Sequence, residues 1–285
     1  MKSINTTPNK YHTHISSKPS RFNLNLKEVW KYRDLIWLFT KRNFVLTYKQ
    51  TILGPLWIFL NPLFTSLIYT FVFGGIANID TGVPSILFYL TSNAAWVYFS
   101  GCVTKNANAF TANAGVFGKV YFPRLTVPIS NVISSVVQFG IQMLLVVAVL
   151  IYYVIVGAVN PIWWAWSLIP VALIHLGALG LGIGIIVSSL TTKYRDLSIL
   201  VTFGMSLWMY ITPIVYPISA TGGILQTILM INPVTQPIEL LRYAILGQGT
   251  IDLLMYGVSI VVTILVLFLG ILIFNKVEKT FMDTV

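Results

Sequence analysis

Residues 125–192 read LTVPISNVISSVVQFGIQMLLVVAVLIYYVIVGAVNPIWWAWSLIPVALIHLGALGLGIGIIVSSLTT and contain no Asp, Glu, Lys or Arg. A helix crosses the hydrocarbon layer with about 20 apolar residues, so this stretch is long enough for two spans. Gly157, Asn160 and Pro161 predict a turn near its middle. In lipid only helices and closed barrels satisfy their own backbone. Runs of this length favour helices, so the sequence predicts an all-α polytopic membrane protein.

The same pattern extends over most of the chain. Residues 197–238 also lack charged side chains, and 9% of all residues are charged. Hydropathy and helix breakers together predict six spans. These lie at residues 53–77, 84–104, 125–156, 165–190, 197–217 and 251–274.

The remaining segments divide the chain further. Residues 218–250 contain Pro233, Pro237, Glu239 and Arg242. They predict short re-entrant helices at the outer interface before the last span. The predicted organisation is a polar cytoplasmic tail (1–25), an amphipathic interfacial helix with a linker (26–50), and a six-span domain (51–285).

Basic residues set the predicted orientation. Of the 18 Lys and Arg, ten lie in residues 1–49 and three in 105–124, with two more at Lys193 and Arg195. The positive-inside rule therefore places both termini, and the connections after the second and fourth spans, in the cytoplasm. This segregation explains the net charge of +10 without nucleic acid. No apolar segment of a cleavable signal peptide follows the first residues.

Residues 26–39 have the periodicity of an amphipathic helix at the cytoplasmic interface. A helical wheel places Leu26, Val29, Trp30, Ile36 and Trp37 on one side, with Arg33 intruding on that apolar arc. The tryptophans are expected at headgroup depth. The periodicity alone leaves open whether this helix is a simple anchor or a docking surface for a cytosolic partner.

Candidate reactive groups are few. Among carboxylates and histidines, His175 alone lies in the cores of the predicted spans. We favour a hydrogen bond from this side chain to a neighbouring helix over a role in a proton relay. Asp80, Glu239 and Asp252 are scattered at predicted outer-face positions, which disfavours an enzyme with a converging acid and base.

Metal and nucleotide sites are not predicted either. Cys102 is the single cysteine, and a solvated role is favoured over metal binding for the tail residues His12 and His14. The stretch Gly115–Lys119 has the wrong spacing for a phosphate-binding loop. We therefore expect no cofactor on this chain, and active transport would need a separate ATPase.

Two short inner loops are candidates for contact with such a partner. Residues 105–118 predict a short polar helix that is followed by the segment 119–124, and the second loop is 191–196. Pro123 ends the first element. The residues alone also fit ordinary inner loops whose positive charge only fixes topology.

Several strings together resemble a known family. They are YKQTILGPLW (48–57), KVYFPRL (119–125), KYRD (193–196), TPIVYP (212–217), NP (232–233) and VEKTF (277–281). In this order they resemble the permease subunits of ATP-binding-cassette exporters of polysaccharides, which move O antigens, capsules and teichoic acids. The resemblance covers about residues 26–285.

The resemblance implies a homodimer of six-span chains in the bacterial inner membrane. Each chain would recruit one ATPase subunit that binds ATP and Mg²⁺, and the substrate would be a glycan on a polyprenyl diphosphate lipid. The implied ATPase-coupling residues are Lys105, Lys119, Phe122, Pro123, Arg124, Lys193, Tyr194, Arg195 and Asp196. The implied residues of the interfacial helix are Trp30, Arg33 and Trp37.

Aromatic and glycine residues complete the set of candidates. Sugar faces stack on aromatic rings, so rings on the first, second and fifth spans are candidates for the glycan channel. These are Tyr69, Tyr89, Trp96, Tyr98, Trp208 and Tyr210, although packing or lipid contact would also explain each. Gly180 and Gly184 predict close helix packing inside one subunit.

The sequence thus favours the channel-forming subunit of an ATP-driven exporter of lipid-linked O-antigen polysaccharide. Capsule or teichoic acid export by the same architecture is an alternative. An ion-coupled secondary transporter is disfavoured because intramembrane charge is scarce, and a glycan-modifying enzyme is disfavoured because no acid and base converge.

Overall fold

The computed structural model describes residues 26–49, 52–192, 194 and 196–280, and these form helices and turns without a strand. Five helical segments within them are long and apolar enough to cross a membrane. They are Gly54–Ile76 (η1, α3 and η2), Ser85–Ala107 (α4), Thr126–Ile155 (α6), Trp163–Thr191 (η3 and α7) and Leu253–Val277 within α11. The expected all-α, multi-pass class is therefore confirmed. The tail of residues 1–25 lies outside the described residues.

These elements have separate bounds. The first span consists of η1 (Gly54–Leu56), α3 (Trp57–Tyr69) and the π-helical η2 (Thr70–Ile76). The fourth consists of η3 (Trp163–Leu168) and α7 (Ile169–Thr191), and α11 runs over Leu253–Thr280. Gly157, at φ 76°, turns the chain between α6 and η3, where a turn was predicted.

The fifth predicted span, 197–217, is shorter in the structure. Its helix α8 covers Leu197–Tyr210, 14 residues, which is about 21 Å against a hydrocarbon layer of roughly 30 Å. The helix ends there because Pro213 follows and the Asn232 side chain donates to the Ile211 carbonyl at 2.9 Å. The helical part of the predicted span therefore ends at Tyr210.

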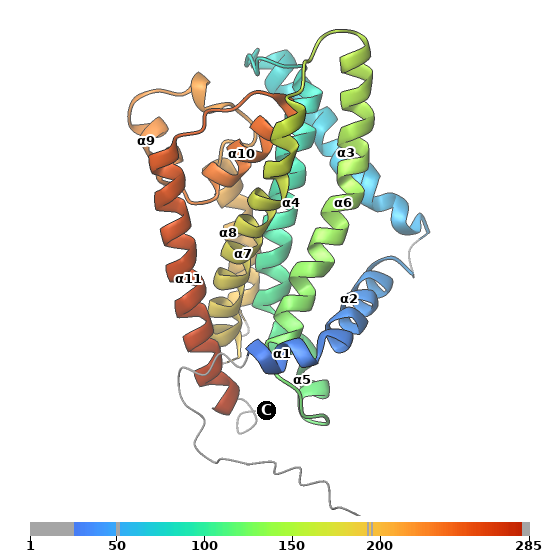
Figure 1. The fold of residues 1–285 in the computed structure, drawn as a ribbon, viewed down its shortest axis with the longest axis vertical. Helices are drawn as coiled ribbons and strands as arrows, with labels where there is room; N and C mark the ends of the chain where they lie inside the picture. The colour runs from blue at the N-terminus through green and yellow to red at the C-terminus, as the bar shows by residue number, and fades with distance from the viewer. Residues whose placement is uncertain (1–25, 50–51, 193, 195, 281–285) are drawn as a thin grey trace, which may run out of the picture.

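Three short helices follow α8 at the upper end of the bundle in Figure 1. They are η4 (Ile218–Ala220), α9 (Gly223–Ile231) and α10 (Thr235–Leu246). Helix α10 packs against α4, α7 and η3, and nearly all its residues are buried. Residues 218–250 thus form short helices, as expected, and not a long span.

The N-terminal segment forms two helices in place of one. Helix α1 covers Leu26–Lys31, α2 covers Arg33–Tyr48, and the backbone bends at Tyr32. Most of the segment 40–50, which was expected to be a linker, therefore belongs to helix α2. Val29 and Ile36 are buried.

Trp30 and Trp37 do not share this buried face. Their side chains are 70% and 63% exposed. Each follows a buried residue by one position, which on a helix is about 100° of rotation. Val29 and Ile36 therefore face the bundle, and Trp30 and Trp37 face outward beside them. Their place on one apolar side at headgroup depth stays a prediction.

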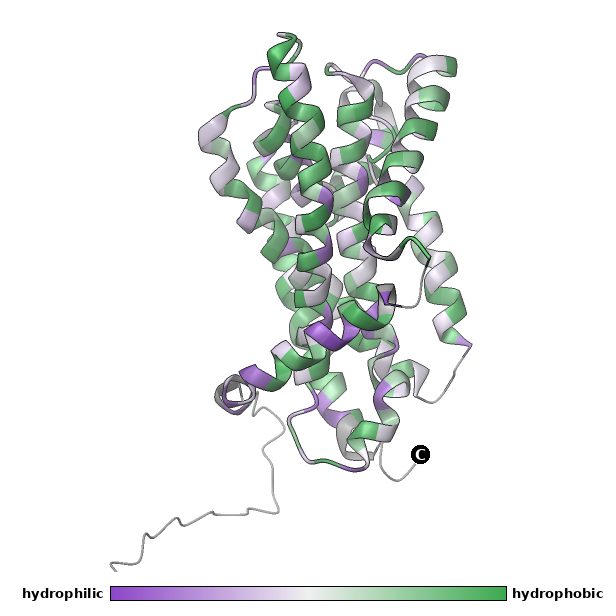
Figure 2. Ribbon diagram, turned by 90° about the vertical axis from the view of Figure 1, so that its right-hand side faces the viewer, coloured by the Kyte–Doolittle hydropathy of each residue, from purple (hydrophilic) through white to green (hydrophobic). Residues whose placement is uncertain are grey.

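Helix α4 forms the centre of the bundle. In the most apolar 18-residue stretch of this helix 78% of the residues are buried, whereas the figure for the corresponding stretch of the span Gly54–Ile76 is 17%. It packs against α3, α6, α7, α8 and α10. Figure 2 shows hydrophobic residues along the bundle and hydrophilic residues gathered on α1, α2 and the nearby loops at its lower end.

Glycines let α7 approach two neighbours closely. A Cβ on Gly180 would lie 2.7 Å from the Cβ of Cys102, and one on Gly184 would lie 3.0 Å from the carbonyl oxygen of Val103, both on α4. A Cβ on Gly182 would lie 2.9 Å from the backbone of Leu267 on α11. The predicted close packing inside one subunit is therefore confirmed.

We expect Gly182→Ala to lower the free energy of unfolding by about 1–3 kcal/mol, because the new methyl group overlaps the backbone of α11. Gly140→Ala on α6 is the matched control, since nothing lies within 4 Å of its Cβ position. Melting temperatures in detergent would measure the difference. Equal melting temperatures for the two variants would contradict the packing argument.

Candidate functional site

A cluster of phenylalanine rings supports the loop at the lower end of the bundle. Helix α5 (Ala109–Phe117) forms where a short polar helix was predicted. The Phe122 ring centroid lies 5.6 Å from that of Phe117 and 5.7 Å from that of Phe39 on α2. On its other side, Phe110 stacks on Phe274 of α11 at 4.5 Å. The loop is thus packed against helices from both ends of the chain.

The predicted coupling residues of this loop differ in exposure. Lys119 is exposed, whereas Phe122 is 5% exposed and belongs to the ring cluster. Pro123 is partly buried, and the Arg124 guanidinium lies 5.6 Å from the centroid of the Phe117 ring. The most exposed ring is Tyr121, at 85%. Phe122 therefore supports this surface from below and offers no side-chain area to a partner.

The second predicted loop lies beside the first. The Thr191 hydroxyl donates to the carbonyl oxygen of Ala107 at 2.8 Å, and the Ser188 hydroxyl accepts from the Phe110 amide at 3.3 Å. Tyr194, 56% exposed, and the exposed Asp196 follow α7. Lys193 and Arg195 lie outside the described residues.

Lys105 is not on this loop. It lies in the last turn of α4, and its ammonium group donates to the Ser135 hydroxyl at 3.2 Å and to the Gln138 side-chain oxygen at 3.4 Å. Both acceptors belong to α6. The Lys105 side chain thus extends along a membrane span, and its predicted contact with an ATPase stays a prediction.

A chain of amide side chains attaches α2 to the bundle, and sequence reasoning missed it. Asn43 donates to the Asn131 side-chain oxygen at 2.9 Å, and Asn131 donates to that of Asn106 at 3.0 Å. Arg42 donates to the side-chain oxygen of Asn113 on α5 at 2.8 Å. These contacts join α2 to α6, α4 and α5.

Three of the six predicted channel rings lie inside the protomer. Tyr89, Trp96 and Tyr98 are 0%, 5% and 3% exposed. The Tyr98 hydroxyl donates to the Leu173 carbonyl at 3.1 Å. These three rings pack the core of the protomer, and a place for them in a channel stays a prediction.

The other three predicted rings are accessible to different degrees. Tyr210 is 58% exposed, whereas Tyr69 and Trp208 are partly buried. Trp208 donates to the Asn232 side-chain oxygen at 3.2 Å. Tyr69 on α3 approaches Met209 on α8, with 3.7 Å between the hydroxyl oxygen and the sulfur. Tyr69 thus lies at a contact between α3 and α8, whereas the Trp208 ring also packs on Phe99 of α4, with 5.5 Å between the ring centroids.

His175 connects helices inside the bundle. Its Nε2 lies 2.9 Å from the Thr263 hydroxyl and 3.1 Å from the Ser259 hydroxyl, both on α11. Ser259 in turn donates to the Pro233 carbonyl at 2.6 Å. This is the interhelical hydrogen bonding that was favoured over a proton relay.

An ion pair lies at the opposite end of the bundle. Glu239 and Arg242, both on α10, bond to each other and are 3% and 2% exposed. Arg242 also donates to the Pro213 carbonyl at 2.6 Å and lies over the Phe88 ring at 4.5 Å. Glu239 accepts from the Thr250 amide at 3.3 Å.

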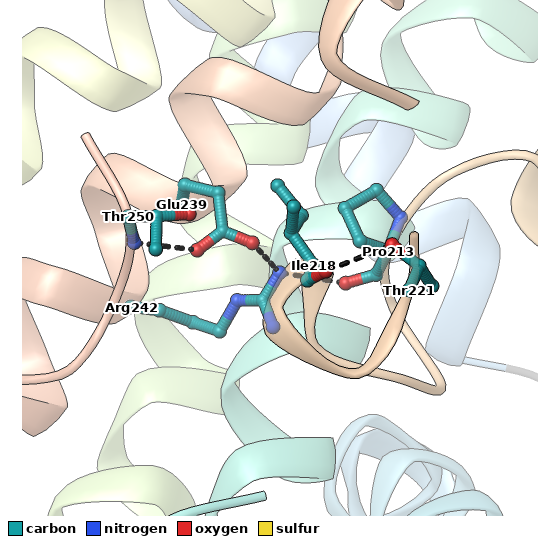
Figure 3. A network of polar contacts seen from close by, with 6 residues as sticks. All are labelled: Pro213, Ile218, Thr221, Glu239, Arg242 and Thr250. Atoms are coloured by element: carbon teal, nitrogen blue, oxygen red, sulfur yellow. Dashed lines mark hydrogen bonds and ion pairs between the residues drawn. The ribbon is translucent and has the colours of Figure 1, made fainter. Parts of the chain in front are cut away.

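Figure 3 shows how this pair bridges the segments before and after α10. Sequence reasoning expected Glu239 at a scattered outer-face position, and the structure adds that its side chain is buried and paired with Arg242. The sequence signal for this ion pair is the spacing of three residues between Glu239 and Arg242, because that spacing places both side chains on one face of a helix.

The fold and these contacts define a multi-pass helical membrane protein with a basic, aromatic loop surface at one end, the class that includes transport permeases. A model of the ABC-2 type transporter family matches residues 34–246. The chain belongs to this family.

Similar proteins extend over most of its length. The O-antigen export system permease protein RfbA of Klebsiella pneumoniae is 31% identical over 256 residues, 88% of this chain and 94% of that protein. A second Klebsiella pneumoniae protein of that name is 30% identical with the same coverage. One from Myxococcus xanthus is 26% identical over 197 residues, 68% of this chain and 72% of that protein.

We expect Arg242→Met to lower the free energy of unfolding by about 3–5 kcal/mol, because it leaves the Glu239 carboxylate buried without its partner. The double variant Glu239→Gln/Arg242→Met removes both charges and is expected to recover much of that loss. Melting temperatures of the two variants measure this. A double variant as unstable as the single one would show that packing, and not charge, is responsible.

Proposed function

We propose that this chain is the membrane subunit of an ATP-driven exporter of O-antigen polysaccharide. Two copies form the channel, a separate ATPase subunit binds ATP and Mg²⁺, and the glycan travels on a lipid carrier. The observation that carries the proposal is the match to O-antigen export permeases over 88% of this chain and 94% of the relative.

The proposed topology has six spans in the bacterial inner membrane. Helix α8 and the buried residues Thr212–Val215 after it form the fifth, and α9 and α10 are re-entrant at the outer surface. Basic residues support an orientation with both termini and the α5 end in the cytoplasm.

The loop surface at the α5 end suits docking of an ATPase. Lys119 and Tyr121 project from a loop that the phenylalanine cluster fixes, and exposed aromatic side chains on a rigid base are typical binding anchors. Trp30, Arg33 and Trp37 remain proposed residues of the cytoplasmic interface. The coupling roles of Pro123, Arg124, Tyr194 and Asp196 also remain proposals.

For the glycan path we retain the rings that are accessible in the protomer. Tyr210 is the most exposed of them, Tyr69 contacts its neighbour Met209, and Trp208 is partly buried. Aromatic rings give a hydroxylated polymer weak, repeated contacts. We propose that these three rings face the path between two copies of the chain.

The purified chain alone is expected neither to bind nor to hydrolyse ATP, and to copurify with a coexpressed nucleotide-binding subunit. The reason is that its nearest glycine-lysine segment, Gly115–Lys119, does not have the spacing of a phosphate loop. An ATPase assay on the isolated chain and on the coexpressed complex tests this. ATP turnover by the isolated chain would refute the proposal that a separate subunit hydrolyses ATP.

Tyr121→Ala is expected to reduce the amount of copurified ATPase about tenfold, because loss of an aromatic interface anchor costs about 1–2 kcal/mol. Trp163→Ala is the matched control, since Trp163 is 63% exposed but lies at the other end of the bundle. Both variants should keep the wild-type melting temperature. Equal ATPase recovery for both variants would exclude Tyr121 from the docking surface.

A further inference from the structure

Lys105 has an unusual position for a lysine at the end of a span. It is the basic residue in the last turn of α4. A lysine there commonly extends toward the nearby headgroups. Its ammonium instead bonds to Ser135 and Gln138 on α6. Gln138 lies twelve residues after the start of α6, about 18 Å along that helix.

The direction of the side chain follows from helix geometry. The Cα–Cβ bonds of a helix tilt toward its N-terminus. For α4 that direction leads away from the α5 end and into the bundle. The charge of Lys105 is therefore held within the membrane span, where an ionisable side chain is costly and indicates a functional site.

No carboxylate forms an ion pair with Lys105 in the described part of the chain. Its two acceptors are a neutral hydroxyl and a neutral amide, at the long distances of 3.2 and 3.4 Å. These acceptors use two of its three N–H groups. These neutral acceptors leave the ammonium of Lys105 without a counter-charge among the described residues.

A second cation lies in the same polar region. The Asn131 side chain donates to the Lys105 carbonyl at 3.3 Å and accepts from Asn43, the neighbour of Arg42. The hydrogen-bond acceptors of the Arg42 side chain are also neutral amides, and its guanidinium lies 4.7 Å from the centroid of the Phe39 ring. Its buried Nε has no hydrogen-bond acceptor among the described residues. This region thus offers two cations and an unused donor.

The face of α4 beside Lys105 is polar and accessible. Ser100, Thr104 and Asn108 follow one another at four-residue intervals and are each partly exposed. Helix α3, which packs on both α4 and α6, carries exposed apolar side chains such as Phe64 and Ile68. A polar cationic strip beside an apolar surface suits a ligand with an anionic head and a hydrocarbon tail.

We propose that Lys105, held by Ser135 and Gln138, binds the phosphate group of the lipid carrier that bears the exported glycan. Phosphate oxygens accept charge-assisted hydrogen bonds from the ammonium, and the polyprenyl chain stays in the membrane beside α3. Arg42 lies on the cytoplasmic side of this contact. The assignment of the lipid rests on the proposed export function, whereas the recognition of an anionic headgroup does not.

The test measures binding to the full-length chain in detergent by microscale thermophoresis. The probes are undecaprenyl diphosphate, undecaprenol and phosphatidylglycerol. Wild-type protein should bind the diphosphate roughly tenfold tighter than undecaprenol, since hydrogen bonds to charged groups contribute that much. Lys105→Gln should remove this preference, and Lys105→Arg should retain most of it. Lys276→Gln, at an exposed lysine on α11, is the charge-matched control.

Each outcome decides the proposal. Wild-type affinity in Lys105→Gln would overturn it, and Lys105→Met repeats the test if the glutamine variant has a lowered melting temperature. Equal, Lys105-dependent binding of phosphatidylglycerol would overturn the assignment to the lipid carrier but support an anionic headgroup site. Normal surface O antigen in cells that lack the chain would refute the export function and leave the binding result standing.

Discussion

Close backbone contact between α7 and its two neighbours is the interaction on which the bundle depends. Lipid is as apolar as the side chains, so burial of apolar area gives helices little reason to associate in a membrane. Gly180 and Gly184 bring α7 against α4, and Gly182 brings it against α11. Because α4 also contacts α3, α6, α8 and α10, the position of every other span is set relative to this group of three.

Features that depend on local sequence could be predicted. Long uncharged runs gave the main spans, Gly157 gave the turn between two of them, and Gly180 with Gly184 indicated close packing. The end of α8 could not be predicted in this way. It depends on Asn232, twenty-one residues further along the chain than the Ile211 carbonyl that it caps.

Side-chain orientation on α4 was equally beyond sequence reasoning. This helix is buried on several sides, so its sequence has little amphipathic periodicity to indicate which face is which. Tyr89, Trp96 and Tyr98 therefore looked available for a channel although they pack the core. For the same reason Lys105 read as a loop residue, and only the structure shows its ammonium against α6.

The two anchors of α5 have a mechanical consequence. Asn113 ties this helix to Arg42 near the start of the chain, and Phe110 ties it to Phe274 near the end. A force applied at the exposed loop cannot displace α5 alone, because it strains a polar contact on one side and a ring stack on the other. A force on this short helix is therefore shared between α2 and α11.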